Sequence, residues 1–212
     1  PGTAAAAGPA QSRNIHKNDY TTWSRPVTSY LYGNNGGLTR VEYTGGQIVV
    51  EDYDSSFALQ SSRTVPMELS IWGGFFAGED YNFLIFGDTN RDEDDSKEVI
   101  RVVKYSKDWV RLDQASLYGA QTYIPFDAGT VRCAEYNGML YVDTCHERYA
   151  DSNGLHHQFS MLFSVRQSDM TITDKRLSGT AAVSHSFNQF ILIDSNGQIV
   201  TLDHGDANPR SA

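Results

Sequence analysis

The segment of this 212-residue chain with the clearest potential for chemistry is the acidic loop at residues 88–98, where six acidic side chains accompany two basic ones. Oxygen-bearing side chains at alternate positions suit Ca²⁺, which takes about six to eight hard oxygen ligands. Glu93 stands where a calcium-binding EF-hand loop needs Gly, so the loop departs from that motif. Two interpretations stay open, a solvated acidic loop or a Ca²⁺ site. The candidate ligands are Asp88, Asn90, Asp92 and Asp94.

Histidines form a second group of candidates. His146 follows Cys145, and His156 and His157 close the loop at residues 150–155. Cys, His and Asp side chains bind Zn²⁺, but no pair here has a compact ligand spacing. The alternative is that these histidines are hydrogen-bonded or exposed. The chain has no G-x-S-x-G, no H-E-x-x-H and no phosphate-binding loop. The candidates for a catalytic role are His146, His185 and His204.

Aromatic side chains next to Asp and Asn suggest a surface that binds carbohydrate, because an exposed ring can stack on a sugar and carboxylates accept hydrogen bonds from hydroxyl groups. The segment at residues 72–76 combines one Trp, two Gly and two Phe. The alternative is that these rings pack between sheets. The candidate ligand-binding residues are Trp72, Asp143, His157 and Asp203.

The two cysteines, Cys133 and Cys145, are not positioned for a disulfide. A two-residue turn at Asn137-Gly138 pairs position 133 with Val142. Cys145 is three residues beyond Val142 and therefore points to the opposite face of the sheet. A bridge needs a bulge or a wider turn. The adjacent Cys145 and His146 also point to opposite faces, so they form no nucleophile–base pair by themselves.

Two series of repeated segments give the elements that must position these residues. Members of the first series contain an apolar strand, a short polar turn and the start of another strand, at intervals of about 50–60 residues, the range of propeller blades. Members of the second begin at a turn and run through an apolar strand to Asp, and Asn137-Gly138 and Asn196-Gly197 predict two-residue hairpin turns. The first series is 49–59, 102–112 and 161–172, and the second is 81–88, 136–143 and 195–203.

Together the two series predict an all-β fold, a β-propeller of four-stranded blades that is incomplete, with about three and a half blades. An all-β sandwich or irregular barrel is the alternative. Residues 1–26 are expected to be a linker or N-terminal arm and residues 27–212 a partial β-propeller domain. The predicted blades are residues 27–66, 71–118 and 128–177, with a fourth that begins near Ser184. The predicted strands of the third are Thr130–Tyr136, Met139–Thr144, Phe159–Val165 and Met170–Leu177.

The motif at residues 137–142, followed after a long loop by residues 163–169, resembles a Kelch-type blade. Residues 83–87, followed by Val102-Val-Lys-Tyr105 and Trp109, resemble one too. Kelch blades usually carry a Gly-Gly doublet at the end of the second strand, where this chain has Gly87 alone, so the resemblance is to divergent Kelch-type blades. Over residues 27–206 the chain resembles bacterial secreted or surface propeller proteins, which implies an extracellular or cell-surface location.

Composition narrows the function. The net charge of −9 and the lack of a basic patch disfavour nucleic acid, and no apolar run approaches the ~18 residues that span a bilayer. Because a propeller needs at least about four blades, we expect a cleaved fragment, a partial sequence, or a partner chain or subunit that completes the propeller. The sequence favours a non-enzymatic binding or assembly module, stabilised by Ca²⁺, with carbohydrate as a further partner. The alternative is a glycan lyase or hydrolase of a propeller class that uses His and Asp at the loop face. An intracellular Kelch-like adaptor is disfavoured.

Overall fold

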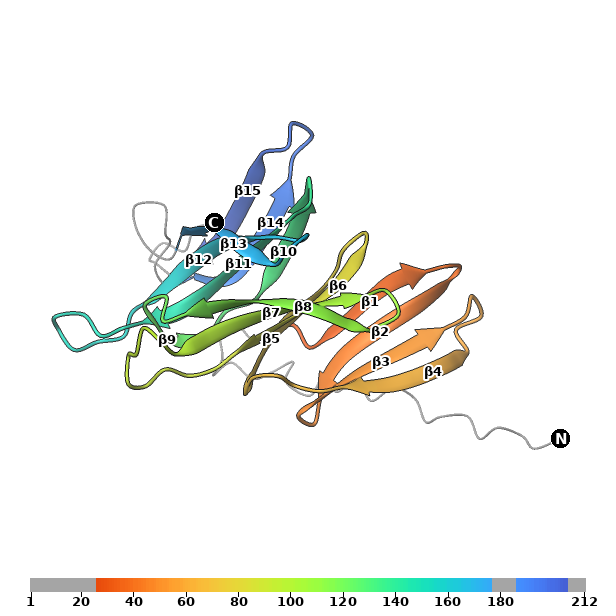
Figure 1. The fold of residues 1–212 in the computed structure, drawn as a ribbon, viewed down its shortest axis with the longest axis horizontal. Helices are drawn as coiled ribbons and strands as arrows, with labels where there is room; N and C mark the ends of the chain where they lie inside the picture. The colour runs from red at the N-terminus through yellow and green to blue at the C-terminus, as the bar shows by residue number, and fades with distance from the viewer. Residues whose placement is uncertain (1–25, 177–185, 206–212) are drawn as a thin grey trace. The chain divides into compact units, whose positions relative to one another are not determined.

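The computed structural model describes residues 26–176 and 186–205, and within them all regular structure is β (Figure 1). Contacts divide the chain into two compact units. Residues 28–67 belong to the first unit, and the other described residues belong to the second. Among the described residues, no helix is long and apolar enough to cross a membrane. The predicted N-terminal arm, apart from residue 26, lies outside the described residues.

The first unit contains one antiparallel sheet in the order β1-β2-β3-β4. Successive strands pair through short turns, and Asn35 and Gly36 have the positive φ angles that a tight hairpin turn between β1 and β2 requires. One face carries the buried apolar side chains Val41, Ile48, Val50 and Val65. The strands are β1 (Ser29–Asn34), β2 (Gly37–Thr44), β3 (Gln47–Tyr53) and β4 (Leu59–Val65).

The second unit begins with another four-stranded antiparallel sheet, in the order β5-β6-β7-β8. Its central strand β6 is buried along nearly its whole length, because it is covered on both faces. A continuous apolar run such as residues 83–86 is the sequence expected of such a strand. The strands are β5 (Ile71–Ala77), β6 (Tyr81–Gly87), β7 (Glu98–Ser106) and β8 (Arg111–Tyr118).

A third sheet, in the order β10-β11-β12-β13, repeats this pattern and adds the short strand β9, which pairs with the end of β11. At the turn between β10 and β11, Asn137 and Gly138 have φ angles of 48° and 73°, as the predicted two-residue turn requires. The strands are β9 (Thr122–Pro125), β10 (Arg132–Tyr136), β11 (Met139–Arg148), β12 (Gln158–Arg166) and β13 (Thr171–Arg176).

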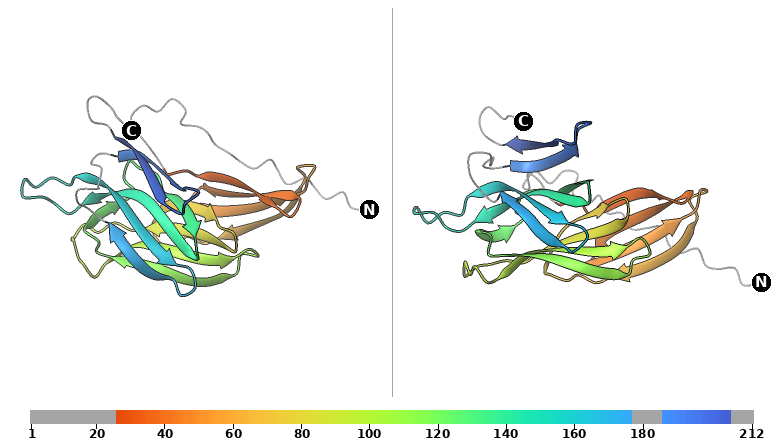
Figure 2. Two further views of the ribbon diagram at one scale, coloured as in Figure 1. Left: turned by 90° about the horizontal axis from the view of Figure 1, so that it is seen from above. Right: turned by 45° about the horizontal axis from the view of Figure 1, so that its top comes forward.

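The second and third sheets stack face to face, and the main hydrophobic core lies between them (Figure 2). Aromatic and branched side chains from both sheets fill this layer, as alternate residues along each strand point inward. The side chains at its centre are Phe83, Ile85, Val102, Leu117, Leu140, Val142, Met161, Phe163 and Val165.

The hairpin β14 (Ser186–Ile193) and β15 (Ile199–Gly205) packs on the other face of the third sheet, so the second unit has three layers (Figure 2). The contact is made mainly by β14 against β10 and β11. The fully buried Gln189 accepts a hydrogen bond from the Thr130 amide (2.7 Å), and its own amide donates to the Thr130 hydroxyl (2.9 Å). These two residues fix the hairpin to the sheet.

The predicted fold class is confirmed: the described chain is all β, with two four-stranded antiparallel sheets of the propeller-blade type, a third that adds β9 to four such strands, and a two-stranded fourth, an incomplete set of blades. The predicted blade limits agree with the observed sheets to within a few residues. The turn at Asn196-Gly197 was predicted wrongly. It spans Asp194–Gln198, because the Asp194 carboxylate accepts hydrogen bonds from the Asn196 and Gln198 amides and holds a longer turn.

Candidate functional site

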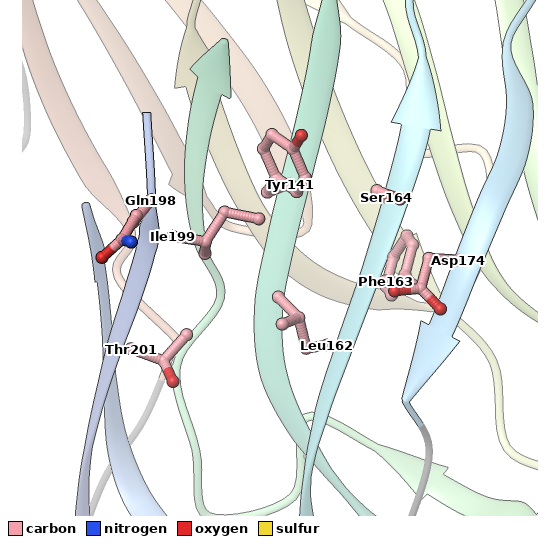
Figure 3. Close-up of a pocket in the computed structure, with 8 residues that line it drawn as sticks. All are labelled: Tyr141, Leu162, Phe163, Ser164, Asp174, Gln198, Ile199 and Thr201. Carbon is pink, nitrogen blue, oxygen red and sulfur yellow. The ribbon is translucent and has the colours of Figure 1, made fainter. Parts of the chain in front are cut away.

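A cavity of about 360 Å³ lies in the second unit between the third sheet and the hairpin (Figure 3). One wall comes from β11, β12 and β13 and the other from the turn before β15 and from β15 itself. The lining mixes apolar, hydroxyl, amide and carboxylate groups, which suits a small amphipathic ligand. The lining residues are Tyr141, Leu162, Phe163, Ser164, Asp174, Gln198, Ile199 and Thr201.

Strand register explains why these residues gather. Tyr141 pairs with Ser164, and Ser164 pairs with Asp174 across the next ladder. Residues directly opposite each other in antiparallel strands point to the same face. The alternate residues Leu140 and Val142 point to the hydrophobic core instead. One face of the sheet therefore serves stability and the other forms the cavity wall.

Asp143 extends this face by one further alternate position and pairs with Leu162, a cavity residue. Its side chain is 2% exposed, and its Oδ2 atom has no hydrogen-bond partner. Burial, with the negative charge of Asp203 on β15 as a second cause, raises the pKa of Asp143 to about 8. The structure thus brings together two of the predicted ligand-binding residues, Asp143 and Asp203.

Arg132 is the cross-strand partner of Asp143, yet no ion pair joins them among the described contacts. The Arg132 guanidinium instead lies 5.6 Å from the centre of the Phe190 ring on β14. Its Nε atom is buried and without a hydrogen bond. The carboxyl of Asp143 therefore keeps an unused hydrogen-bonding atom next to the cavity.

Both cysteines are free thiols, as the strand register predicted. Cys133 pairs with Val142, and Cys145 lies on the opposite face. The Cys145 thiol donates to the Asp127 carbonyl (3.2 Å) and accepts from the Gln158 amide. Burial raises the pKa of both thiols, so neither is a thiolate at neutral pH.

The acidic loop is held by its own hydrogen bonds. Burial raises the pKa of Asp88, but the hydrogen bonds that it accepts from Lys97, the Ser70 hydroxyl and the Thr89 amide together outweigh burial and leave the pKa below its usual value. Asp94 accepts from the Ser96 amide and hydroxyl, and both lower its pKa. The buried Asn90 donates to the Asp94 carbonyl and the Tyr149 hydroxyl, both at 3.0 Å.

These hydrogen bonds do not gather the predicted calcium ligands into one cluster. Across residues 26–176 and 186–205, no group of three or more His, Cys, Asp or Glu side chains has the arrangement of a metal site. Asp92 is exposed next to Glu93, and Asn90 uses its amide for the loop itself. Ca²⁺ binding by this loop stays a prediction.

The acidic loop and the histidine loop meet at one end of the second unit. The Ala150 amide donates to Glu93 (2.9 Å), and the Tyr149 hydroxyl donates to Asp95 (3.1 Å). The His156 ring stacks on Tyr123, with 3.7 Å between ring centres. His157, a predicted ligand-binding residue, lies 3.7 Å from Asp151 within its own loop.

Among the described residues, none of the three histidines considered for catalysis shares a cleft with Asp143. His146 is fully buried, lies 2.7 Å from the Thr122 hydroxyl, and points to the sheet face opposite Asp143. His185 and the side chain of His204 are outside the described residues. The histidine–aspartate grouping expected at the loop face is therefore not seen in the described part of the chain.

The expectation that Trp72 is exposed for sugar stacking is wrong. Trp72 is 4% exposed, packs edge-on against Phe86, and donates its indole N–H to the Val27 carbonyl (2.8 Å). An aromatic residue on the covered strand β5 packs inward because that removes a large apolar ring from water.

Sequence reasoning missed Tyr141, Ser164, Asp174 and Thr201 as cavity residues. For Tyr141 a signal was present in the alternation of β11, where the polar residues Tyr141 and Asp143 alternate with the buried apolar residues at positions 140 and 142. This pattern did not predict the cavity, because the cavity forms only where the hairpin packs against the polar face of the sheet.

Comparisons with known proteins give likeness of structure only. No family model matches the chain, and no curated protein matches it. A solved structure titled as a D477G ACO/RPE65 chimera aligns at 10% identity with a TM-score of 0.49, over 84% of this chain and 49% of that one. An endo-arabinase from Bacteroides thetaiotaomicron VPI-5482 aligns at 12% identity with a TM-score of 0.44, over 89% of this chain and 74% of that one. The chain thus spans about half the length of the chimera, and neither likeness transfers a residue or an activity to it.

Proposed function

We propose that the chain is an extracytoplasmic propeller-type module for binding and assembly, whose fourth blade is completed by strands from a partner chain or subunit. The resemblance of residues 137–142 and 163–169 to a divergent Kelch-type blade supports the fold family, and the wider resemblance of residues 27–206 to bacterial secreted or surface propeller proteins supports the location. The hairpin β14–β15 supports the assembly role.

The observation that carries the proposal is the outer face of this hairpin. Phe190 pairs with Leu202, and Leu192 pairs with Val200, so these four side chains share one face. They are 44–55% exposed. An exposed apolar sheet face is typical of an interaction surface. In the described residues β15 also has an unpaired edge, to which an extended segment can add.

Sedimentation velocity of the isolated chain tests the proposal. We expect concentration-dependent self-association, because the four apolar side chains remain about half exposed even with Arg132 beside the Phe190 ring. Leu192→Glu should shift the chain to monomer, since it places a charge on that face. Leu155→Glu is the matched control, because Leu155 is similarly exposed (58%) but lies in the histidine loop. A wild-type chain that stays monomeric at high concentration contradicts the proposal.

Ca²⁺ stabilisation is a second part of the proposal and rests on the composition of the acidic loop. Binding would require Lys97 to leave Asp88, so its effect is measurable. A chelator should lower the melting temperature of the wild type and leave Asp92→Asn unaffected. An unchanged wild-type melting curve rules this part out.

A glycan-active enzyme is the second candidate, favoured by one observation. Glycosidases use two carboxyl groups, one of them protonated at neutral pH. Asp143, whose pKa is raised to about 8, would be the protonated group, and Asp203 would be the second carboxyl group. Release of reducing sugar from a panel of polysaccharides tests it. Activity that disappears in both Asp143→Asn and Asp203→Asn supports an enzyme, and activity unchanged in both variants contradicts this assignment.

A further inference from the structure

We propose that the cavity beside β11–β13 and β15 is a binding site for a cationic nitrogen group, an ammonium or guanidinium on a short aliphatic chain, which pairs with Asp143 and Asp203 at one end of the cavity. The site depends only on how the hairpin packs on β11, so it stands apart from the assembly role proposed for the hairpin's outer face.

The placement of the carboxylates follows from the two strands that face each other. Tyr141 on β11 and Thr201 on β15 both line the cavity. Asp143 and Asp203 are the next residues on the same faces, two positions further along each strand. The negative charge of Asp203 acts on the Asp143 carboxyl. The two carboxyl-bearing residues therefore follow the cavity lining on its two strands, one alternate position beyond the residues that line it.

Asp143 is the residue that points to a ligand. A carboxyl group that is 98% buried normally has hydrogen-bond partners, whereas its Oδ2 atom has none. A cationic N–H donor would satisfy this atom and offset the repulsion between Asp143 and Asp203. A neutral sugar hydroxyl would donate a hydrogen bond to the Oδ2 atom but would not offset the repulsion between the two carboxyl groups.

The cavity walls fit the rest of such a ligand. Leu162, Ile199 and Tyr141 provide apolar surface for methylene groups, while Ser164 and Thr201 carry hydroxyl groups. At about 360 Å³ the cavity is small for a ligand pocket, which favours a group the size of an arginine or lysine side chain over an oligosaccharide.

The other ionisable residues around Asp143 set its pH dependence. Asp174 lies on this face of β13, and the side chain of Arg176 is outside the described residues. Arg132 lies on β10 and Cys145 further along β11, while β12 and β14 present the neutral Leu162 and Gln189. With a pKa of about 8, Asp143 is mostly protonated at pH 6 and mostly ionised at pH 9. Cation binding should therefore strengthen over this range and release a proton.

Isothermal titration of the full chain with N-acetyl-arginine methylamide tests the proposal, with N-acetyl-citrulline methylamide as the neutral analogue of similar shape. We expect the arginine derivative to bind at least about tenfold more tightly, a difference set by one charged hydrogen-bonded pair. Its affinity should rise at least about tenfold from pH 6 to pH 9, because Asp143 changes from mostly protonated to mostly ionised. Asp143→Asn should abolish the preference, whereas Asp151→Asn, which removes the same charge from an exposed loop, should keep it.

Equal binding of the two derivatives by the wild type overturns the proposal, as does a preference that survives in Asp143→Asn. If that variant fails to fold, Asp203→Asn serves the same test. Two further titrations distinguish the sources of the cation. A strand-forming peptide with one central arginine that binds more tightly than the free derivative indicates a docked protein strand, and equal affinity indicates a small free ligand. The result of the sedimentation experiment changes neither outcome.

Discussion

At the scale of single residues, strand parity determines which side chains can act together. The sequence alone placed Cys133 opposite Val142 and Cys145 on the other face, and the structure confirms both positions. The same rule places His146 and Asp143 on opposite faces, so they cannot share a site on this strand. The alternation of side chains along a strand does not show which element covers each face of the sheet. The burial of Asp143 therefore could not be predicted from the sequence.

Asp143→Asn should change how stability depends on pH. Because the folded-state pKa of Asp143 is raised to about 8, the folded chain holds this proton more tightly than the unfolded chain does. Its contribution to stability is complete below the unfolded pKa of about 4 and is lost as the pH rises through 8. Asparagine does not titrate. We therefore expect the variant to gain roughly 5 kcal/mol relative to wild type between pH 4 and pH 8, because each pH unit of this interval contributes about 1.4 kcal/mol.

Urea unfolding at several pH values measures this difference. Subtracting the variant from the wild type removes the contribution of the other titrating groups. Asp151→Asn, on an exposed loop, should show no comparable change. A constant difference between wild type and Asp143→Asn across this range would show that Asp143 is not buried as a neutral acid.

Asn90→Ala should destabilise the end of the second unit where the two loops meet. The Asn90 side chain accepts from the Asp94 amide (3.0 Å) and donates to the Asp94 carbonyl and to Tyr149. Removing it leaves these groups without partners in a site that is 3% exposed, at a cost of about 1–3 kcal/mol in the free energy of unfolding. Thermal unfolding in the presence of a chelator measures the loss, with Asp92→Asn as the control because no Ca²⁺-dependent effect of that variant remains, and equal melting temperatures for the two variants would refute it.

At the scale of elements, the blade limits were predictable because each blade repeats the same strand and turn chemistry. The Asn137-Gly138 turn and the apolar runs of β6 and β12 mark their positions directly. β9 was missed because four residues bounded by irregular turns carry no periodicity. The length of the Asp194–Gln198 turn was missed because it depends on one side-chain hydrogen-bond pattern.

Gln189→Leu should release the hairpin β14–β15 from the third sheet without unfolding the sheet itself. The Gln189 side chain accepts from both the amide (2.7 Å) and the hydroxyl (3.0 Å) of Thr130. Leucine is of similar size but leaves the buried Thr130 amide unsatisfied, which costs about 1–3 kcal/mol. Hydrogen exchange should accelerate in β14 and β15 and stay slow in β11 and β12. Ser195→Ala, in the exposed turn, is the control, and uniform acceleration through the whole unit would contradict local release.

At the scale of the whole molecule, the two units differ in how much apolar side-chain surface each buries. The second unit has a continuous core between two stacked sheets. The first has one sheet, and four apolar side chains are buried on one of its faces. Local stability follows the amount of packed apolar surface, so the two units should open at different free energies.

Native-state hydrogen exchange should therefore show β2 and β3 opening before β6 and β11. Val50→Ala and Val165→Ala are a matched pair, because both replace a fully buried valine in a strand, and Val165 lies in the core of the second unit. Each should cost about 1–3 kcal/mol. The first variant should lower protection only in residues 28–67, and the second should lower it through the second unit. If Val165→Ala reduced protection equally in both units, the chain would unfold as one cooperative body, and the difference in core size would not determine its stability.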